Sequence, residues 1–251
     1  MRRDTLPELP WGTGEVLTKA RAVGTALEKL RADPGAAGWC RLPFFRDGEA
    51  DRIAAELDRL CAAGVSLAPP PGLVFRALEL TALERVKAVI LGQDPYPRAG
   101  DAHGLAFSYV GPRAVPASLR VIFRELCQDI GCPAPGHGDL TAWARQGVLL
   151  LNAASTTETG RSGAHMRFGW SVLADQVVAA VSAERPAVAF LLWGQNARSR
   201  AGLIDRGKHL VVESGHPSPL NRARDFPGSR PFSRANEWLA SRGVEPVDWR
   251  L

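Results

Sequence analysis

The sequence predicts an α/β fold, a three-layer α/β/α sandwich with a central, mostly parallel four-stranded sheet. Two observations predict it: four short apolar runs with little alternation, and helical stretches that lie between them. Short, continuous apolar runs suit strands buried on both faces, which is the burial that helices on either side of a parallel sheet impose. Alternation of strands and helices along the chain is the pattern of such layered sheets.

Each predicted strand stops abruptly at Gly, Asn or Ser. The four apolar runs are Val86–Leu91, Gly147–Leu151, Ala187–Trp193 and Lys208–Glu213, and the residues that follow them are Gly92-Gln-Asp-Pro, Asn152, Gly194 and Ser214-Gly-His-Pro. The helical stretches between them are Ser118–Ile130, Trp170–Ala183 and Asn196–Asp205. Ligands of such sheets bind outside the carboxyl ends of the strands. We therefore expect the four polar strand ends to converge in one pocket.

The first sixty or so residues have a different pattern. Apolar residues recur at three- and four-residue spacing over Leu17–Leu30 and Ala50–Leu60, which predicts two helices. The segment Ala68-Pro-Pro-Pro-Gly72 breaks any helix and predicts a stiff, extended loop. We interpret residues 1–251 as a single domain, with a helical N-terminal part over about 1–60 and a catalytic part that carries the motifs over about 65–250.

Composition narrows the class of protein. Hydrophobic residues make up 45% of the chain and charged residues 23%, which is ordinary for a globular protein with a buried core. No apolar run approaches the roughly 20 residues that span a bilayer, and the N-terminus lacks the apolar stretch of a signal peptide. We therefore expect a cytoplasmic protein that does not enter membranes.

The four cysteines form no CxxC pair and no Cys/His spacing typical of metal sites. They are Cys40, Cys61, Cys127 and Cys132. A disulfide framework, a zinc site and an iron–sulfur cluster all lack their usual signature. We expect no metal and no cofactor.

Positive charge is concentrated near the C-terminus. The formal net charge is +5, and residues 196–250 carry ten Arg/Lys against six Asp/Glu, which gives +4 in the last fifth of the chain. A basic patch suits a polyanionic partner, because neutralised phosphates release their counterions. A solvated, arginine-rich surface would have the same composition, so charge alone leaves both interpretations open.

The predicted strand ends offer a specific set of side chains. They comprise a carboxylate (Asp94), a carboxamide (Asn152) and an imidazole (His216), with aromatic rings nearby at Tyr96 and Phe107. No GxGxxG or GxxxxGK[ST] loop is present, which disfavours a nucleotide cofactor, and no GxSxG elbow is present, which disfavours acyl transfer. A site of this kind can grip a flat polar ring, and a carboxylate with a histidine suits cleavage of a glycosidic bond.

Six motifs then resemble, in order, those of the family 1 uracil-DNA glycosylases. The water-activating motif of that family is similar to Gly92-Gln-Asp-Pro-Tyr96 with Gly104-Leu-Ala-Phe-Ser108, and its uracil-recognition strand is similar to Leu149–Asn152. A further strand of the family resembles Leu191–Gly194, and its DNA-intercalation loop resembles Gly215–Leu220. The loops that grip the DNA backbone resemble Ala68–Pro71 and Pro116–Leu119. The match runs from about Pro69 to Trp249. This resemblance implies the family's α/β fold and removal of uracil from DNA by base excision.

The resemblance implies a role for each matching residue in the base pocket. Asp94 would position the attacking water and support the cationic sugar, and His216 would stabilise negative charge on the uracil as a neutral donor. The other residues would bind uracil: the Gln93 backbone amide, Tyr96 as the steric block against thymine, Phe107 as the stacking ring and Asn152 as the reader of the base edge. Ordinary structural roles remain possible for them: a turn carboxylate at Asp94, core packing at Phe107 and strand-end capping at Asn152.

The resemblance also implies contacts to DNA. Leu220 would wedge into the base stack as the nucleotide leaves, as apolar wedges do in other DNA-distorting proteins. The backbone contacts would come from Pro69, Pro70, Pro71, Ser118 and Ser218, with Arg224 as an electrostatic contact. The expected partner is uracil-containing DNA, single- or double-stranded, and the expected oligomeric state is a monomer.

The sequence departs from the family pattern where water and phosphates are handled. Pro97 stands where a histidine is usual, Gly163 replaces another histidine although His165 remains, and Gln195 replaces a serine. Residues 153–158 and 221–227 also differ from the usual sequence. We interpret the chain as a divergent member that retains uracil specificity, in which another group orders the water in place of the histidine missing at Pro97.

Three alternatives remain. A glycosylase of broader scope would act on other damaged bases, but the intact Tyr96 and Asn152 disfavour it. A lesion-binding protein that flips bases without cutting them would lack Asp94 or His216, and both are present. An iron–sulfur uracil glycosylase would require cysteines with cluster spacing.

Overall fold

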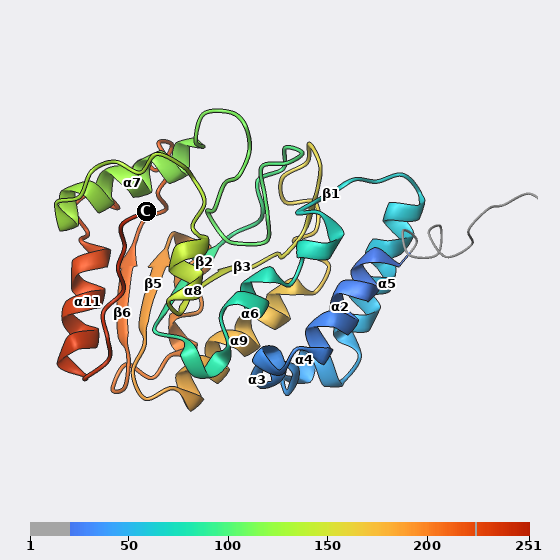
Figure 1. Cartoon of the computed structure of the whole chain (residues 1–251), viewed down its shortest axis with the longest axis horizontal. Helices are drawn as coiled ribbons and strands as arrows, with labels where there is room; N and C mark the ends of the chain where they lie inside the picture. Colours follow the sequence, from blue (N-terminus) through green and yellow to red (C-terminus); the bar gives the residue numbers. More distant parts are fainter. Residues whose placement is uncertain (1–20, 224) are drawn as a thin grey trace, which may run out of the picture.

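The computed structural model describes residues 21–223 and 225–251, and its centre is a four-stranded sheet (Figure 1). The strands are β2 (Ala88–Gly92), β3 (Val148–Asn152), β5 (Ala189–Trp193) and β6 (Leu210–Ser214), in the order β3-β2-β5-β6. All three neighbouring pairs are parallel. The α/β fold is confirmed, and this sheet is entirely rather than mostly parallel.

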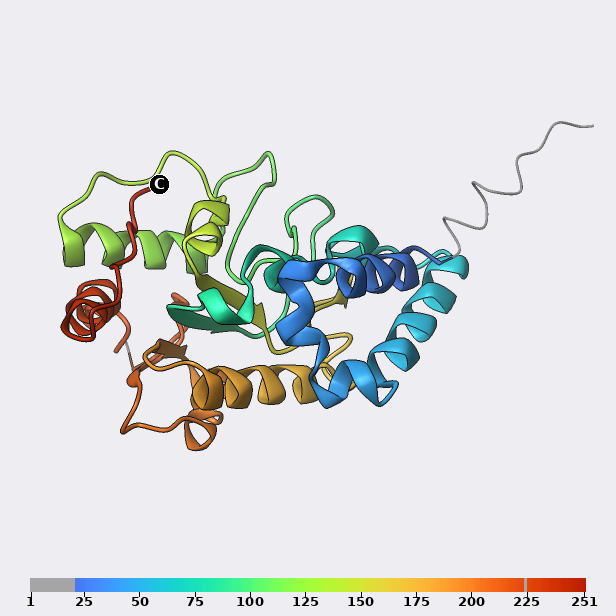
Figure 2. The ribbon, with the colours of Figure 1, turned by 60° about the horizontal axis from the view of Figure 1, so that its bottom comes forward.

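Burial explains why the strand segments are continuously apolar. Every residue of β2, β3 and β5 is buried, whereas β6 has two partly exposed positions, Leu210 and Val211, and one exposed position, Glu213. The larger helices around the sheet are α7 (Ala117–Ile130), α9 (Trp170–Glu184) and α11 (Pro231–Ser241), with the shorter α6 (Arg76–Leu80) and α8 (Thr141–Arg145). Figure 2 shows α9 on one side of the sheet and α7 and α8 on the other, which gives the three predicted layers.

The N-terminal part is helical, as predicted. It comprises α2 (Ala22–Ala32), η1 (Pro34–Ala36), α3 (Ala37–Cys40), α4 (Pro43–Arg46) and α5 (Glu49–Ala62). The predicted helix over 17–30 corresponds to α2, with residues 17–20 outside the described residues, and the predicted helix over 50–60 corresponds to α5. Helices α2 and α5 pack against each other at one end of the sheet (Figure 1).

The proline segment differs from the prediction. Its backbone is extended only through Pro70, and Pro71 begins the 3₁₀ helix η2 (Pro71–Leu73), because the ring of a proline at the first position fixes φ near the helical value. The preceding residues form β1 (Leu67–Ala68), which pairs antiparallel with β4 (Thr157–Glu158). Neither this two-stranded sheet nor α11 was predicted.

The predicted helix over 196–205 is also wrong in length. It is divided into α10 (Gln195–Arg198) and the 3₁₀ helix η4 (Ala201–Leu203). The buried guanidinium of Arg200 donates to the carbonyl oxygen of Asn196 at 2.9 Å and lies 2.7 Å from a carboxylate oxygen of Asp175 on α9. These contacts turn the chain at Arg200, where the backbone amide bonds three residues back rather than four.

One continuous hydrophobic core runs from Val23 in α2 to Trp249 near the C-terminus. It joins the N-terminal helices to the sheet. None of the helices among these residues is long and apolar enough to span a membrane.

The start of α2 depends on a carboxylate from another helix. Arg21 at its N-cap makes no side-chain cap, and Asp58 of α5 instead accepts hydrogen bonds from the amides of Val23 at 2.8 Å and Gly24 at 3.0 Å. Since Asp58 is 7% exposed, its removal leaves buried amides unpaired. We expect Asp58→Ala to lower the free energy of unfolding by about 1–3 kcal/mol in denaturant titrations. The exposed Asp47, whose side chain bonds nothing in the described part, provides a control: an equal effect of Asp47→Ala would contradict the capping role.

Candidate active site

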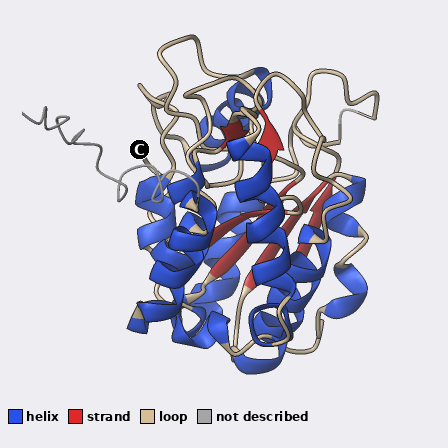
Figure 3. Ribbon diagram, turned by 90° about the vertical axis from the view of Figure 1, so that its right-hand side faces the viewer, coloured by secondary structure: helices blue, strands red, loops and turns tan. Residues whose placement is uncertain are grey.

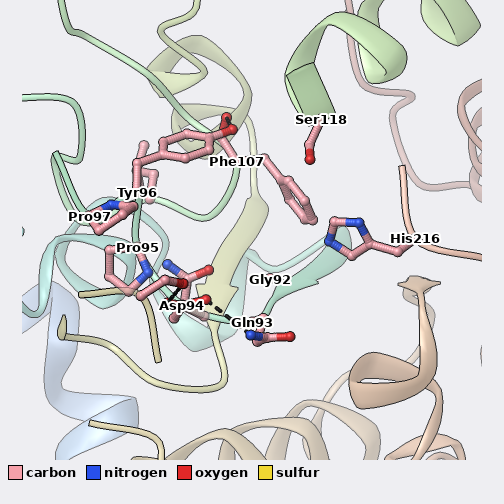
Figure 4. Close-up of a pocket in the computed structure, with 12 residues that line it drawn as sticks. Gly92, Gln93, Asp94, Pro95, Tyr96, Pro97, Phe107, Ser118 and His216 are labelled. Carbon is pink, nitrogen blue, oxygen red and sulfur yellow. Dashed lines mark hydrogen bonds between the residues drawn. The ribbon is translucent and has the colours of Figure 1, made fainter. Parts of the chain in front are cut away.

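A cavity of about 210 Å³ lies at the carboxyl ends of the strands. Figure 3 shows the loops gathered at one end of the sheet, and Figure 4 shows the residues that line the cavity. Asp94 follows β2, Asn152 ends β3 and His216 follows β6, and all three side chains line it. The predicted convergence of polar strand ends is therefore confirmed for these three strands. The remaining lining residues are Gly92, Gln93, Pro95, Tyr96, Pro97, Leu105, Phe107, Ser118 and Ser162.

The floor of the cavity is set by the parallel pairing of β2 and β3, in which Gly92 lies opposite Asn152. A Cβ atom at Gly92 would lie 2.1 Å from Oδ1 of Asn152. Only glycine therefore lets this carboxamide cross the end of β2. Asn152 is 8% exposed, and its carboxamide makes no hydrogen bond to any residue in the described ranges. The carboxamide is thus free to bond a ligand in the cavity.

Two aromatic residues form one wall of the cavity. The hydroxyl of Tyr96 donates to the carbonyl oxygen of Phe107 at 3.1 Å, and the Tyr96 ring contacts Tyr109 edge-on with 6.2 Å between centroids. Phe107 has φ of 60°, which is uncommon for a residue with a side chain. Its ring lies 5.6 Å from Trp193 and 5.7 Å from His216, centroid to centroid. Phe107 therefore both packs on the core and presents its ring to the cavity.

His216 lies across the cavity from Asp94 (Figure 4). Burial lowers the pKa of its imidazole below the ordinary value, because a charged ring there would lose its hydration. This favours the neutral imidazole, which carries one N–H.

The carboxylate of Asp94 is held from two directions. Its Oδ2 accepts hydrogen bonds from Ser162 Oγ and the Gly163 amide, both at 2.7 Å, and its Oδ1 accepts one from Gln93 Nε2 at 3.3 Å. Asp94 caps no helix among the described residues, and its carboxylate bonds the segment after β4 instead. Sequence reasoning missed Ser162, which no motif covers, and treated Gly163 only as the loss of a histidine.

The exposed side chain of Leu220 projects from a loop with internal support. Leu220 is 89% exposed. Its amide donates to Ser218 Oγ at 3.2 Å, and Asn221 Nδ2 donates to Asp225 Oδ1 at 3.0 Å. Beyond the loop, the buried carboxylate of Glu125 on α7 accepts hydrogen bonds from the Gly228 and Arg230 amides at 2.6 and 2.9 Å. We call residues 215–227 the wedge loop.

Of the other predicted DNA contacts, only Ser118 lines the cavity among the described residues. Ser118, in the first turn of α7, lines the cavity, whereas Ser218 lines an adjoining hollow of about 400 Å³. Pro70 and Pro71 line a separate surface hollow, and Pro69 beside them is buried. Arg224 lies outside the described residues.

The retained His165 and the departure at Gln195 both lie outside the cavity lining. His165 is fully buried: its Nδ1 pairs with Thr156 Oγ1 at 2.9 Å, and its ring stacks on Phe168 with 4.1 Å between centroids. Gln195 is exposed at the start of α10. Among residues 21–223 and 225–251, no three His, Cys, Asp or Glu side chains cluster in a way that could hold a metal ion.

Comparison with known proteins gives a consistent result. The family model of the uracil DNA glycosylase superfamily matches residues 80–240. A uracil-DNA glycosylase of Azotobacter vinelandii is 50% identical over 195 residues, which cover 78% of this chain and 84% of that protein. One of Chromobacterium violaceum is 48% identical over 199 residues, with the same coverage. The crystal structure of mimivirus uracil-DNA glycosylase superposes with a TM-score of 0.82 at 26% identity, covering 98% of this chain and 95% of that one.

The matched range contains β2, β3, β5 and β6 and all three side chains that converge from their carboxyl ends. Both the central sheet and the cavity thus lie in the part shared with these relatives. The chain belongs to the uracil-DNA glycosylase superfamily.

Proposed function

We propose that the cavity releases uracil from DNA by hydrolysing the N-glycosidic bond, which leaves an abasic site. The observation that carries this proposal is the convergence of Asp94, Asn152 and His216 on one cavity that Phe107 walls. The relatives named uracil-DNA glycosylase support the same activity, and the protein is accordingly a hydrolytic N-glycosylase that acts in DNA repair.

In this proposal, the side chain of Asn152 and the backbone amide of Gln93 recognise uracil. The carboxamide can accept from the base N–H and donate to the neighbouring carbonyl, so a single orientation satisfies both edges of the uracil amide. The backbone N–H of Gln93, which donates to no residue in the described ranges, would supply a further donor. Phe107 would stack on the face of the base. Buried polar groups of this kind reject a base that leaves them unpaired.

Asp94 and His216 would carry the bond cleavage. The bond between the sugar C1′ and the base N1 breaks, its electron pair leaves with uracil, and an oxocarbenium-like sugar develops that the Asp94 carboxylate stabilises. Water positioned by Asp94 adds to C1′ and passes its proton to the Asp94 carboxylate, and the proton is finally taken up by the uracil anion. His216, neutral because burial lowers its pKa, would donate its N–H to the uracil oxygen where negative charge accumulates.

The base must leave the duplex before it can enter the cavity. Leu220 on the wedge loop would fill the space that the base vacates, which its exposure permits. Ser118, Ser218 and the prolines Pro69–Pro71 would hold the DNA backbone on either side of the lesion, with Arg224 as a further contact. Because these contacts involve the DNA backbone and no second strand, we propose activity on both single- and double-stranded DNA.

We further propose that the protein acts as a monomer in the cytoplasm. Within the described residues the exposed large apolar side chains are Val110, Val172, Leu203 and Leu220, which lie on separate elements. A stable oligomer would need a contiguous apolar patch.

The activity is tested with oligonucleotides that contain uracil in single and double strands, compared with thymine mismatches, hypoxanthine and undamaged DNA. We expect release of uracil only. Asp94→Asn removes the carboxylate charge that supports the cationic sugar, so the single-turnover rate should fall by about two orders of magnitude or more while DNA binding is retained. Failure of the wild-type protein to release any base would refute the proposed activity.

Tyr96 provides a test of base selection. Its ring is fixed by the hydrogen bond to Phe107 and the contact with Tyr109, so it cannot swing aside for a larger base. We expect Tyr96→Ala to release thymine at a rate measurable over the wild-type background, since the cavity gains room for the 5-methyl group. Tyr96→Phe keeps the ring and serves as the control. Thymine release by neither variant would mean that another group excludes the methyl.

Leu220 provides a test of base extrusion. Its side chain contacts little of the protein, so Leu220→Ala should leave the stability unchanged. We expect cleavage of duplex substrate to slow by about tenfold, and cleavage of single strands to change by less than about twofold, because an unpaired base needs no wedge. Val110→Ala, at another exposed apolar position, is the control. Equal loss on both substrates would assign Leu220 a role other than the wedge.

A further inference from the structure

Asp94 receives its two shortest hydrogen bonds from a segment that lies after β3. Ser162 Oγ and the Gly163 amide converge on the same oxygen, Oδ2, while Oδ1 has only the longer contact at 3.3 Å from Gln93. We call residues 157–165 the clamp loop. Two donors on one oxygen fix both the position and the plane of the carboxylate.

The clamp loop is itself held in shape. Thr157 Oγ1 donates to the carbonyl oxygen of Arg161 at 2.5 Å and accepts from the Ala164 amide at 3.2 Å, which closes the loop on itself. The Gly160 amide donates to the carbonyl oxygen of Pro97 at 2.7 Å, which ties the loop to the segment that carries Asp94. The loop therefore contacts that segment at two points, the carbonyl of Pro97 and the carboxylate of Asp94.

The base of the loop is anchored in the core. Trp170 Nε1 donates to Thr156 Oγ1, and the same hydroxyl pairs with His165 Nδ1 at 2.9 Å. Burial lowers the pKa of His165, which favours the neutral ring in this anchor. Gly163 lies in the clamp loop between β4 and His165. Its φ of +73° favours glycine and turns its amide toward Asp94.

We infer that Ser162 is a positioning residue for Asp94. Together with the Gly163 amide, it orients the carboxylate by hydrogen bonds that Pro97 cannot donate. This inference rests on the proposed function, because it assigns Asp94 the catalytic role. A proline at 97 has no N–H and no donor side chain. Its carbonyl instead holds the clamp loop in place, and the loop provides the donors.

The electrostatic effect of Ser162 increases when substrate is bound. Ser162 is exposed in the free protein, where water competes for its hydrogen bond. DNA seated over the cavity excludes that water, and a charge-assisted hydrogen bond is stronger in the drier environment. The contribution of Ser162 should therefore appear in the chemical step more than in DNA binding.

The test compares Ser162→Ala and Ser162→Thr with the wild-type protein in single-turnover uracil release. We expect Ser162→Ala to lower the cleavage rate by about tenfold to thirtyfold with KM changed by less than about twofold, since the lost bond acts on the transition state. Threonine keeps the hydroxyl and should restore the rate to within about threefold of wild type. Ser171→Ala, an exposed serine outside the site, is the matched control and should leave the rate unchanged.

A second comparison separates action through Asp94 from a general loss of structure. In an Asp94→Ala background, Ser162→Ala should change the residual rate by less than about twofold, because the carboxylate that it positions is absent. An unchanged rate for Ser162→Ala alone, an equal fall with threonine, or an undiminished effect without Asp94 would each overturn the inference. If the wild-type protein released no uracil, the proposed function would fail instead.

Discussion

The geometry of the whole site depends on the parallel pairing of β2 with β3. This pairing places Gly92 opposite Asn152, with room between them for no Cβ atom. A register shift of one residue would turn Asn152 away from the cavity and bring a leucine to its place, because side chains alternate along a strand. The same sheet aligns the carboxyl ends of its strands, so three chemically different side chains reach one cavity without long loops.

The features that could be predicted from the sequence are those that depend on local pattern. The four strands, α7 and α9 follow from apolar runs and helical spacing, and the convergence of Asp94, Asn152 and His216 follows from parallel topology. Uracil as the ligand did not follow from those patterns and came from the ordered motifs. Local pattern was thus sufficient for the layers of the fold and insufficient for the chemistry.

The features that could not be predicted depend on contacts between distant segments. Ser162 belongs to no motif, and its importance appears only when the loop after β3 is placed against Asp94. The helix expected over 196–205 is interrupted at Arg200, whose buried guanidinium lies 2.7 Å from a carboxylate oxygen of Asp175 across the fold, a contact that local helical spacing does not show. The strands β1 and β4 are too short for any periodicity to show.

The two positions at which the sequence analysis expected histidines, Pro97 and Gly163, belong to one hydrogen-bonded arrangement around Asp94. Pro97 and Gly163 each remove a side-chain donor, yet both contribute backbone groups to the same arrangement, a carbonyl acceptor and an amide donor. The segment that follows the wedge loop shows the same use of backbone groups, since Glu125 accepts from the amides of Gly228 and Arg230. Because α7 carries both Glu125 and Ser118, the support of that segment and one wall of the cavity belong to the same rigid helix. A shift of α7 would therefore move the segment at the end of the wedge loop and the Ser118 side of the cavity together.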